Sequence, residues 1–150
     1  VIHQVGENNY KTAIHQSRSM GIKEGRRGYH PVPFLELEDL KNAFAGADIV
    51  ISRAGANSIS EIAANKKPAI LIPLATAANN HQKMNAYALS EEGGAIVLEE
   101  ANLGKHLLLQ KINKIFQDTD LRTNLNHNIA KFYHPDASEK IARGLIELIN

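Results

Sequence analysis

The stretch DIVISRAGANSISE, residues 48–61, contains residue types that suit the binding of a phosphate. Its apolar run predicts a buried strand, a loop of small residues follows at 53–57, and a helical pattern begins at Ser58. Unpaired backbone N–H groups and the helix dipole both favour negative charge at the N-terminus of a helix. We therefore expect a phosphate or diphosphate to approach the backbone at Gly55. An ordinary turn that needs positive φ is the alternative interpretation of this glycine.

Glu61 lies within the first turn of that expected helix, where its carboxylate would repel a phosphate. It is suited instead to accepting hydrogen bonds from a neighbouring diol, such as that of a ribose. Ser58 and Glu61 also form an S-x-x-E capping box, in which the carboxylate would bond to the N–H at the start of its own helix. Both interpretations stay open, because a ligand could displace the cap.

A second group of polar residues opens the next expected helix: Asn79, Asn80, His81, Gln82 and Asn85. Gln82 and Asn85 are three residues apart and share a face. Their amides offer donors and acceptors together, which suits sugar hydroxyls, although a capped and solvated helix start explains them equally well. His81 either faces a ligand or lies on the surface. No second histidine or carboxylate has metal-ligand spacing with it, so we expect no metal site.

Side chains at two other strand ends leave alternatives open. Arg53 could hold a phosphate or balance nearby carboxylates. Phe34 and Leu35 could cover a flat base, although core packing is the commoner fate of such residues. The other histidines are scattered and form no arrangement typical of a nucleophile or a metal site.

These residues need a scaffold, and expected strands alternate with expected helices along the chain. The strands or extended segments are Val1–Val5, Tyr29–Leu35, Asp48–Ser52, Pro68–Leu74 and Ala95–Leu98. The helices are Asn8–Met20, a segment around Leu37–Phe44, Ser58–Ala64, Asn80–Glu91, Leu103–Gln117, Asp120–Lys131 and Asp136–Ile149. This alternation predicts an α/β fold with a parallel sheet covered by helices on both faces. Ligands bind at the carboxyl ends of such strands, where 53–58 and 74–81 begin.

Composition limits the possible classes. A chain of 150 residues, 43% hydrophobic and 22% charged, fits one globular domain. A net charge of +1 gives no support to a nucleic-acid partner. The absence of cysteine excludes disulfides and thiolate metal sites. No apolar run approaches the roughly 20 residues that span a bilayer. Since the chain begins at Val1 in mid-pattern without an initiator Met, we interpret it as a fragment.

The run SRAGANSISEIAANKKPAILIPLATAANNHQKMNAYAL resembles the donor-binding half of MurG-type transferases. That family adds N-acetylglucosamine from UDP-N-acetylglucosamine to a lipid-linked muramyl-peptide in peptidoglycan synthesis. The resemblance extends from the IHQVG strand through EEANL and is most specific in SRAGA-x-S-x-SE and in KPAILIPL followed by NHQ-x-x-NA. It implies that residues 1–150 form the Rossmann-like C-terminal half of a two-domain GT-B glycosyltransferase. The acceptor domain, with its proposed catalytic base, and the first strand of the donor domain would be missing.

The resemblance also implies roles for single residues. Glu61 would bind the ribose, the backbone of Ala56–Ser60 would approach the diphosphate and sugar, and Leu35 would meet the uracil through its backbone. Gln82 and Asn85 would hold the sugar hydroxyls, with His81 beside them. Asn57, Asn79 and Asn80 depart from the family pattern. The expected substrate-binding residues are thus Leu35, Arg53, Gly55, Ala56, Asn57, Ser58, Ile59, Ser60, Glu61, His81, Gln82 and Asn85, with no catalytic residue.

The function implied is that of an inverting, metal-independent hexosyltransferase without a cofactor, active in cell-wall synthesis and so in cell shape, division and the cell cycle. Its partners would be UDP-N-acetylglucosamine and, through the missing domain, the lipid-linked acceptor. The full-length protein would lie peripherally on the cytoplasmic face of the bacterial inner membrane, and the chain alone would be inactive. Alternatives are the donor-binding subunit of a two-chain dolichol-linked transferase, half of a UDP-N-acetylglucosamine 2-epimerase, or a non-enzymatic nucleotide-sensing module.

Overall fold

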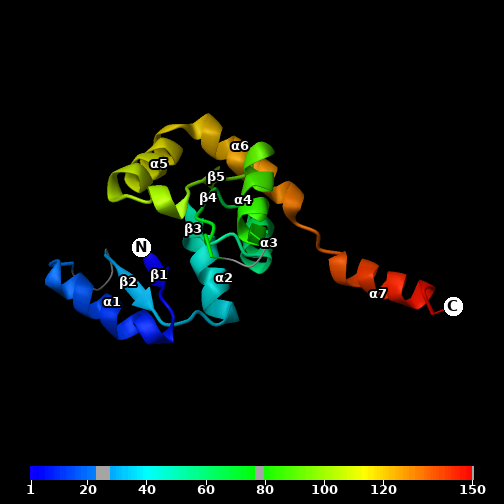
Figure 1. Cartoon of the computed structure of the whole chain (residues 1–150), viewed down its shortest axis with the longest axis horizontal. Helices are drawn as coiled ribbons and strands as arrows, with labels where there is room; N and C mark the ends of the chain where they lie inside the picture. Colours follow the sequence, from blue (N-terminus) through cyan, green and yellow to red (C-terminus); the bar gives the residue numbers. More distant parts are fainter. Residues whose placement is uncertain (23–27, 77–79, 150) are drawn as a thin grey trace. The chain divides into compact units, whose positions relative to one another are not determined.

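The structure, a computed structural model, describes residues 1–22, 28–76 and 80–149. The chain divides into two compact units, Val1–Gly46 and Ala47–Asn150. Figure 1 labels their elements. The expectation that 1–150 acts as one donor-binding domain stays a prediction.

The smaller unit pairs two short parallel strands with two helices. Its elements are β1 (Ile2–Gln4), α1 (Glu7–Ser19), β2 (His30–Val32) and α2 (Leu37–Gly46). Gly6 makes the turn from β1 into α1 with φ +79°, a conformation that glycine adopts without steric cost. β2 carries Pro31, which cannot donate to a ladder and is therefore tolerated in an edge strand.

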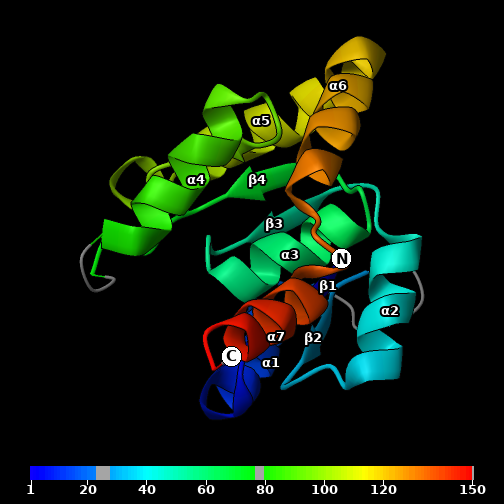
Figure 2. The ribbon, with the colours of Figure 1, turned by 90° about the vertical axis from the view of Figure 1, so that its right-hand side faces the viewer.

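The larger unit is a three-stranded parallel sheet in the order β3-β4-β5, surrounded by helices. Its elements are β3 (Val50–Ser52), α3 (Ala56–Ala64), β4 (Ala69–Leu71), α4 (His81–Glu91), β5 (Ile96–Val97), η2 (Glu100–Asn102), α5 (Lys105–Gln117), α6 (Thr119–Ile129), η3 (Ala130–Phe132) and α7 (Ala137–Glu147). Figures 1 and 2 both show α3 and α5 on opposite sides of this sheet. The predicted α/β class, with parallel strands and helices on both faces, is confirmed.

The core of the larger unit forms around its central strand. β4 is buried throughout, because it is the central strand and helices cover both faces of the sheet. Ile70 of β4 and the adjoining Ile72 pack with Ile115 of α5 and Leu125 of α6. This packing fixes the strand ends from which the polar residues of interest project.

β1 and β3 belong to separate sheets, and each has one strand partner among the described residues. Their outer apolar side chains are correspondingly exposed, Ile2 to 54% and Ile51 to 45%.

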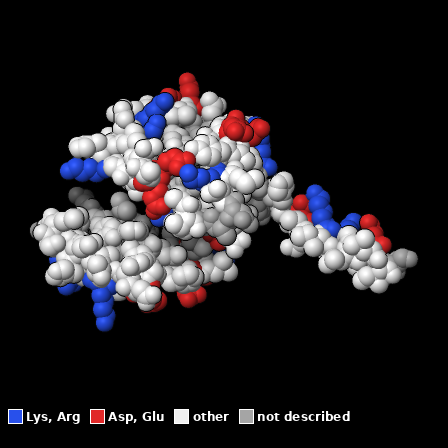
Figure 3. Space-filling view, in the orientation of Figure 1, with Lys and Arg blue, Asp and Glu red and all other residues white. Residues whose placement is uncertain are grey.

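Charged side chains of both signs are interspersed on the face shown in Figure 3. This distribution agrees with a net charge of +1, and the face shown has no single-sign patch that would attract a polyanion. None of the helices in the described ranges has the length and apolar character needed to cross a membrane.

Candidate functional site

The N-terminus of α3 presents backbone N–H groups without helical partners. Gly55 is the N-cap in an extended conformation (φ −71°, ψ 146°), and no side chain caps the helix. The first helical hydrogen bond runs from Ile59 N to Gly55 O at 3.0 Å. The N–H groups of Ala56, Asn57 and Ser58 therefore have no acceptor within the helix. This arrangement can receive a phosphate, since the donors and the helix dipole act together.

The predicted start of this helix at Ser58 is wrong, and with it the capping-box interpretation. α3 begins at Ala56, so Ser58 is its third residue rather than its cap. The physical reason is that the extended Gly55 already ends the strand-to-helix loop. Its carbonyl accepts the first helical bond, which leaves no place for a second cap within the helix.

Gly55 has open space around it. The alternative interpretation, a turn with positive φ, is wrong because its φ is −71°. A Cβ placed on Gly55 would meet no atom within 4 Å. Gly94 differs, since a Cβ there would lie 3.2 Å from Ile129 N. Neither the backbone nor the packing of the described chain thus requires glycine at position 55, and the space beside it is accessible to a ligand.

Glu61 is the sixth residue of α3 and is exposed. Its carboxylate has no hydrogen-bond or ion-pair partner among the described residues, whereas its backbone carbonyl accepts from Asn65. Residues four apart share a helix face, and side chains lean toward the helix N-terminus. The carboxylate of Glu61 therefore lies on the same face as Asn57. Ser60 is exposed, whereas Ile59 is only 7% exposed and belongs to the core, so Ile59 can contribute to a site only through its backbone.

The start of α4 lies beside the start of α3. Asn85 Nδ2 donates to the carbonyl of Ala54, the residue before Gly55, at 3.1 Å. Gln82 Oε1 accepts from Leu74 N at 3.0 Å. Each amide thus uses one of its two polar groups to fix a loop. The other group, the NH₂ of Gln82 or the side-chain carbonyl of Asn85, has no partner among the described residues. Asn85 thereby joins α4 to the loop that follows β3, one of the two strand ends at which a ligand was expected.

The remaining polar residues at this helix start have separate positions. His81 is the first residue of α4 and is exposed. Asn80 is its N-cap, with a left-handed backbone at φ 55°. Asn79 lies outside the described residues. In the part of the chain that the structure describes, no cluster of three or more histidine and carboxylate side chains could hold a metal ion.

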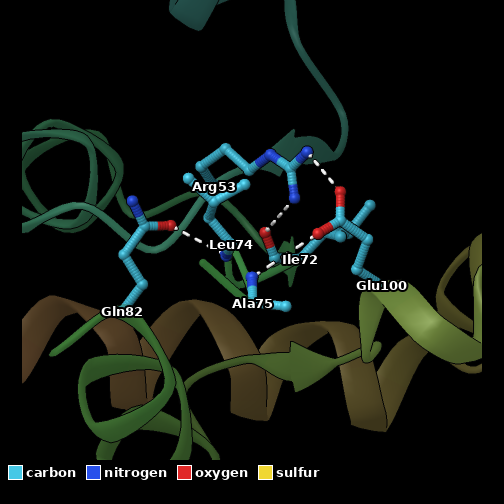
Figure 4. Close-up of polar contacts among 6 residues, drawn as sticks. All are labelled: Arg53, Ile72, Leu74, Ala75, Gln82 and Glu100. Carbon is cyan, nitrogen blue, oxygen red and sulfur yellow. Dashed lines mark hydrogen bonds and ion pairs between the residues drawn. The ribbon is translucent and has the colours of Figure 1, made fainter. Parts of the chain in front are cut away.

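Arg53, directly after β3, is paired with a carboxylate. Its Nη2 lies 2.8 Å from Glu100 Oε1, and its Nη1 donates to the carbonyl of Ile72 at 3.3 Å (Figure 4). The other oxygen of Glu100 accepts from Ala75 N in a long contact of 3.4 Å. The hydrogen bond from Arg53, followed by that from Ala75, holds the pKa of Glu100 below its ordinary value. Of the two interpretations of Arg53, the structure shows the one in which its guanidinium balances a carboxylate.

The neighbouring Glu99 anchors α4 to the same segment. Its carboxylate accepts from Tyr87 Oη at 2.6 Å and pairs with Lys83 Nζ at 3.0 Å. The hydrogen bond from Tyr87, then that from Lys83, lowers the pKa of Glu99. The sequence analysis did not single out Glu99 or Glu100. The signal was available, because both follow an expected strand at its carboxyl end, the rule that selected Arg53.

Leu35 lies in the smaller unit, after β2. Its N–H donates to Gln4 Oε1 at 2.9 Å, and its side chain is half-buried. Phe34 is 61% exposed, so core packing does not account for it. The N–H of Leu35 is therefore engaged by Gln4, while the exposed ring of Phe34 beside it is available to a flat partner.

Two open hollows of the larger unit lie away from the start of α3. One, of about 850 Å³, follows α5 from His106 to Asp120. The other, of about 690 Å³, is lined by β5 with parts of α4 and α5. Neither includes the N-terminal residues of α3 or the amides of Gln82 and Asn85. The candidate site is thus defined by its converging polar groups and not by either hollow.

Comparison with known families and relatives places these observations in context. Residues 1–141 match the model of the family described as Glycosyltransferase family 28 C-terminal domain. A relative from Cytophaga hutchinsonii is 40% identical over 114 residues, which are 76% of this chain and 31% of that protein. A relative from Anaeromyxobacter sp. is 34% identical over 149 residues, 99% of this chain and 37% of that protein. Both are named UDP-N-acetylglucosamine–N-acetylmuramyl-(pentapeptide) pyrophosphoryl-undecaprenol N-acetylglucosamine transferase.

A solved structure supports the fold. The crystal structure of Acinetobacter baumannii MurG superposes with a TM-score of 0.80 at 23% identity, covering 97% of this chain and 42% of that one. At this identity the likeness shows the fold alone. The chain spans about a third of the length of the curated relatives that it matches.

Proposed function

The chain belongs to the glycosyltransferase family 28 C-terminal domain family, and from this premise we propose that it supplies the donor site of a UDP-N-acetylglucosamine-dependent transferase. The acceptor would be a lipid-linked muramyl-pentapeptide, as the names of the relatives state for those proteins. One observation carries the proposal: Asn85 bonds to Ala54, which brings the polar start of α4 against the uncapped start of α3.

The diphosphate of the donor would lie at the start of α3. The N–H groups of Ala56, Asn57 and Ser58 have no helical acceptor, and Gly55 leaves room for close approach. Transfer makes the diphosphate a leaving group, on which negative charge increases. Donors that are already oriented stabilise that charge without reorganising, which lowers the barrier. In this proposal the N–H donors, rather than a metal ion, stabilise the charge of the diphosphate.

The ribose and the sugar would occupy opposite sides of the diphosphate site. Glu61, exposed and without a protein partner in the described ranges, would accept hydrogen bonds from the ribose hydroxyls. The NH₂ of Gln82 and the carbonyl of Asn85 would bond to the hydroxyls of N-acetylglucosamine. Because an amide can both donate and accept, this pair suits a ligand rich in hydroxyl groups.

The uracil would use the backbone at Leu35 and the ring of Phe34. The acceptor and the group that deprotonates it would bind to a region outside this chain, and the transfer would invert the anomeric centre. Peripheral association with the cytoplasmic face of the inner membrane belongs to the same proposal.

Product analysis with the full-length protein tests the proposal. Labelled UDP-N-acetylglucosamine is incubated with lipid-linked muramyl-pentapeptide, and we expect labelled glycolipid plus UDP. The 150-residue chain alone is expected to give no glycolipid. Transfer only to a dolichol-linked acceptor, or release of a 2-epimer, would replace the proposed activity with one of the two enzymatic alternatives. Binding of UDP-N-acetylglucosamine without any product would favour a sensing module.

A further inference from the structure

Arg53 and Glu100 join the carboxyl ends of all three strands of the larger unit. Arg53 follows β3, the carbonyl of Ile72 follows β4, and Glu100 follows β5. The guanidinium bonds to both of the others, at 3.3 Å to Ile72 O and 2.8 Å to Glu100 Oε1 (Figure 4). Glu100 Oε2 then reaches Ala75 N in the loop after β4. The pair thus fixes this loop from the side of β5.

Gln82 holds the same loop from the other side. Its Oε1 accepts a hydrogen bond from Leu74 N at 3.0 Å. The next residue, Ala75, is the one whose N–H donates to Glu100. Figure 4 shows Gln82 and Glu100 approaching the loop from opposite directions. The orientation of the Gln82 amide therefore depends on a loop whose position depends on Glu100.

The charge of Arg53 is balanced where it stands. A guanidinium is always protonated, and Glu100, whose pKa lies below its ordinary value, is ionised at neutral pH. Bonding at 2.8 Å leaves the pair with little net charge to attract a diphosphate. The side chains are 48% and 36% exposed, so the pair contributes little to overall stability. Its effect is therefore on the geometry of the loop.

We infer that Arg53 and Glu100 are positioning residues of the donor site, which set the loop after β4 and through it the Gln82 amide without touching the donor. This inference rests on the proposed function. It assigns Arg53 a role different from phosphate binding and adds Glu100, which lies 47 residues away in sequence.

The test uses Arg53→Gln, Glu100→Gln and the double variant in the full-length protein, with Asp136→Asn as the matched control. Asp136 is also one half of an ion pair, 2.8 Å from Lys140 on α7, but it contacts none of the three strand ends. Calorimetry measures the Kd of UDP-N-acetylglucosamine and of UDP. Amide hydrogen exchange at Ala75 reports the loop without any ligand.

We expect each single variant to raise the Kd of UDP-N-acetylglucosamine by about three- to tenfold, with a smaller change for UDP. The double variant should bind UDP-N-acetylglucosamine no more weakly than the weaker-binding single variant, because both substitutions break the same ion pair. Exchange at Ala75 should accelerate in all three variants and stay unchanged in Asp136→Asn.

Two results would overturn the inference. If Arg53→Gln weakens UDP binding while Glu100→Gln strengthens it, Arg53 is a phosphate ligand that Glu100 restrains. If neither donor affinity nor exchange at Ala75 changes, the pair positions nothing. Absence of UDP binding by the wild-type protein would reject the proposed function alone, because exchange at Ala75 still decides whether the pair fixes the loop.

Discussion

The helices α3 and α5 begin in the same way but in different surroundings. Each has an extended glycine N-cap, Gly55 or Gly104, without a side-chain cap. In each the carbonyl of that glycine accepts the first helical bond at 3.0 Å, and an added Cβ would meet nothing within 4 Å. The start of α3, however, follows a strand and bonds to Asn85 through Ala54, whereas α5 follows the short helix η2.

The difference shows that a helix N-terminus becomes a candidate site only through its neighbours. Both starts offer unpaired N–H groups, but of the two only the loop before α3 accepts a hydrogen bond from an amide side chain of a neighbouring helix among the described residues, that of Asn85. α3 also carries the Glu61 carboxylate, whereas α5 begins with Lys105 and His106. α5 therefore provides an internal control for every substitution made at α3.

The largest expected effect is that of a methyl group at Gly55. Gly55→Ala would place a Cβ in the space through which the diphosphate approaches, separating it from more than one N–H donor. A hydrogen bond to a charged group contributes about 1.5–3 kcal/mol, so loss of two predicts UDP binding weakened about 100-fold or more. Calorimetry with UDP measures this loss, and thermal unfolding measures stability.

Gly104→Ala is the matched control for that substitution. At an N-cap, alanine in place of glycine costs less than about 1 kcal/mol in either helix. We expect both variants to lose similar, small amounts of stability and only Gly55→Ala to lose UDP affinity. Equal UDP affinity in the two variants would show that the start of α3 is no more a phosphate site than the start of α5.

The next effect concerns the sixth residue of each helix. Glu61→Ala in α3 should weaken UDP binding by about 1.5–3 kcal/mol, because a carboxylate bonded to the ribose is lost. Stability should change little, since the Glu61 side chain is exposed and makes no cap. Gln110→Ala in α5 is the control and should alter neither quantity. A fall in stability with unchanged UDP affinity would contradict the ribose assignment.

A smaller effect is expected at Gln82, which has two tasks. Gln82→Ala removes the acceptor of Leu74 N and the NH₂ assigned to the sugar, whereas Gln82→Glu retains an acceptor oxygen. Both should raise the KM for UDP-N-acetylglucosamine about three- to tenfold, because a neutral hydrogen bond contributes about 0.5–1.5 kcal/mol. Gln82→Ala should leave UDP affinity nearly unchanged. Full recovery of KM in Gln82→Glu would mean that only the loop contact matters.

Periodicity predicted nearly all the elements, because apolar strands and amphipathic helices have distinct spacings. It failed at the start of α3. Ser58 carries the stronger N-cap preference, yet α3 begins at Ala56, two residues before its expected start, because the extended Gly55 already ends the loop after β3.

The polar contacts were harder to predict than the elements. Arg53 was identified as pairing with a carboxylate or a phosphate, but Glu100 is 47 residues away and comes near only because β3, β4 and β5 are neighbours. The bond from Leu35 to Gln4 likewise spans 31 residues and depends on the pairing of β1 with β2. Such contacts follow from strand order, which local patterns do not encode.

The smallest expected effect is a pH dependence of stability caused by the Arg53–Glu100 pair. The start of α5 has no such ion pair among the described residues. The pKa of Glu100 is lowered from an ordinary value of 4.5, mainly by the hydrogen bond from Arg53. A carboxylate whose pKa is lower in the folded state stabilises the fold fully above its unfolded pKa. That contribution disappears as pH falls through the folded value.

The melting temperature of wild type should therefore exceed that of Glu100→Gln slightly at pH 7. The difference between the two melting temperatures should shrink as pH falls below about 4.5. The corresponding difference for Gln110→Ala should stay near zero at every pH. If the difference in melting temperature between wild type and Glu100→Gln stays constant down to pH 3, the charge of Glu100 does not hold the pair together. The contribution of Glu100 would then come from the shape of its side chain alone.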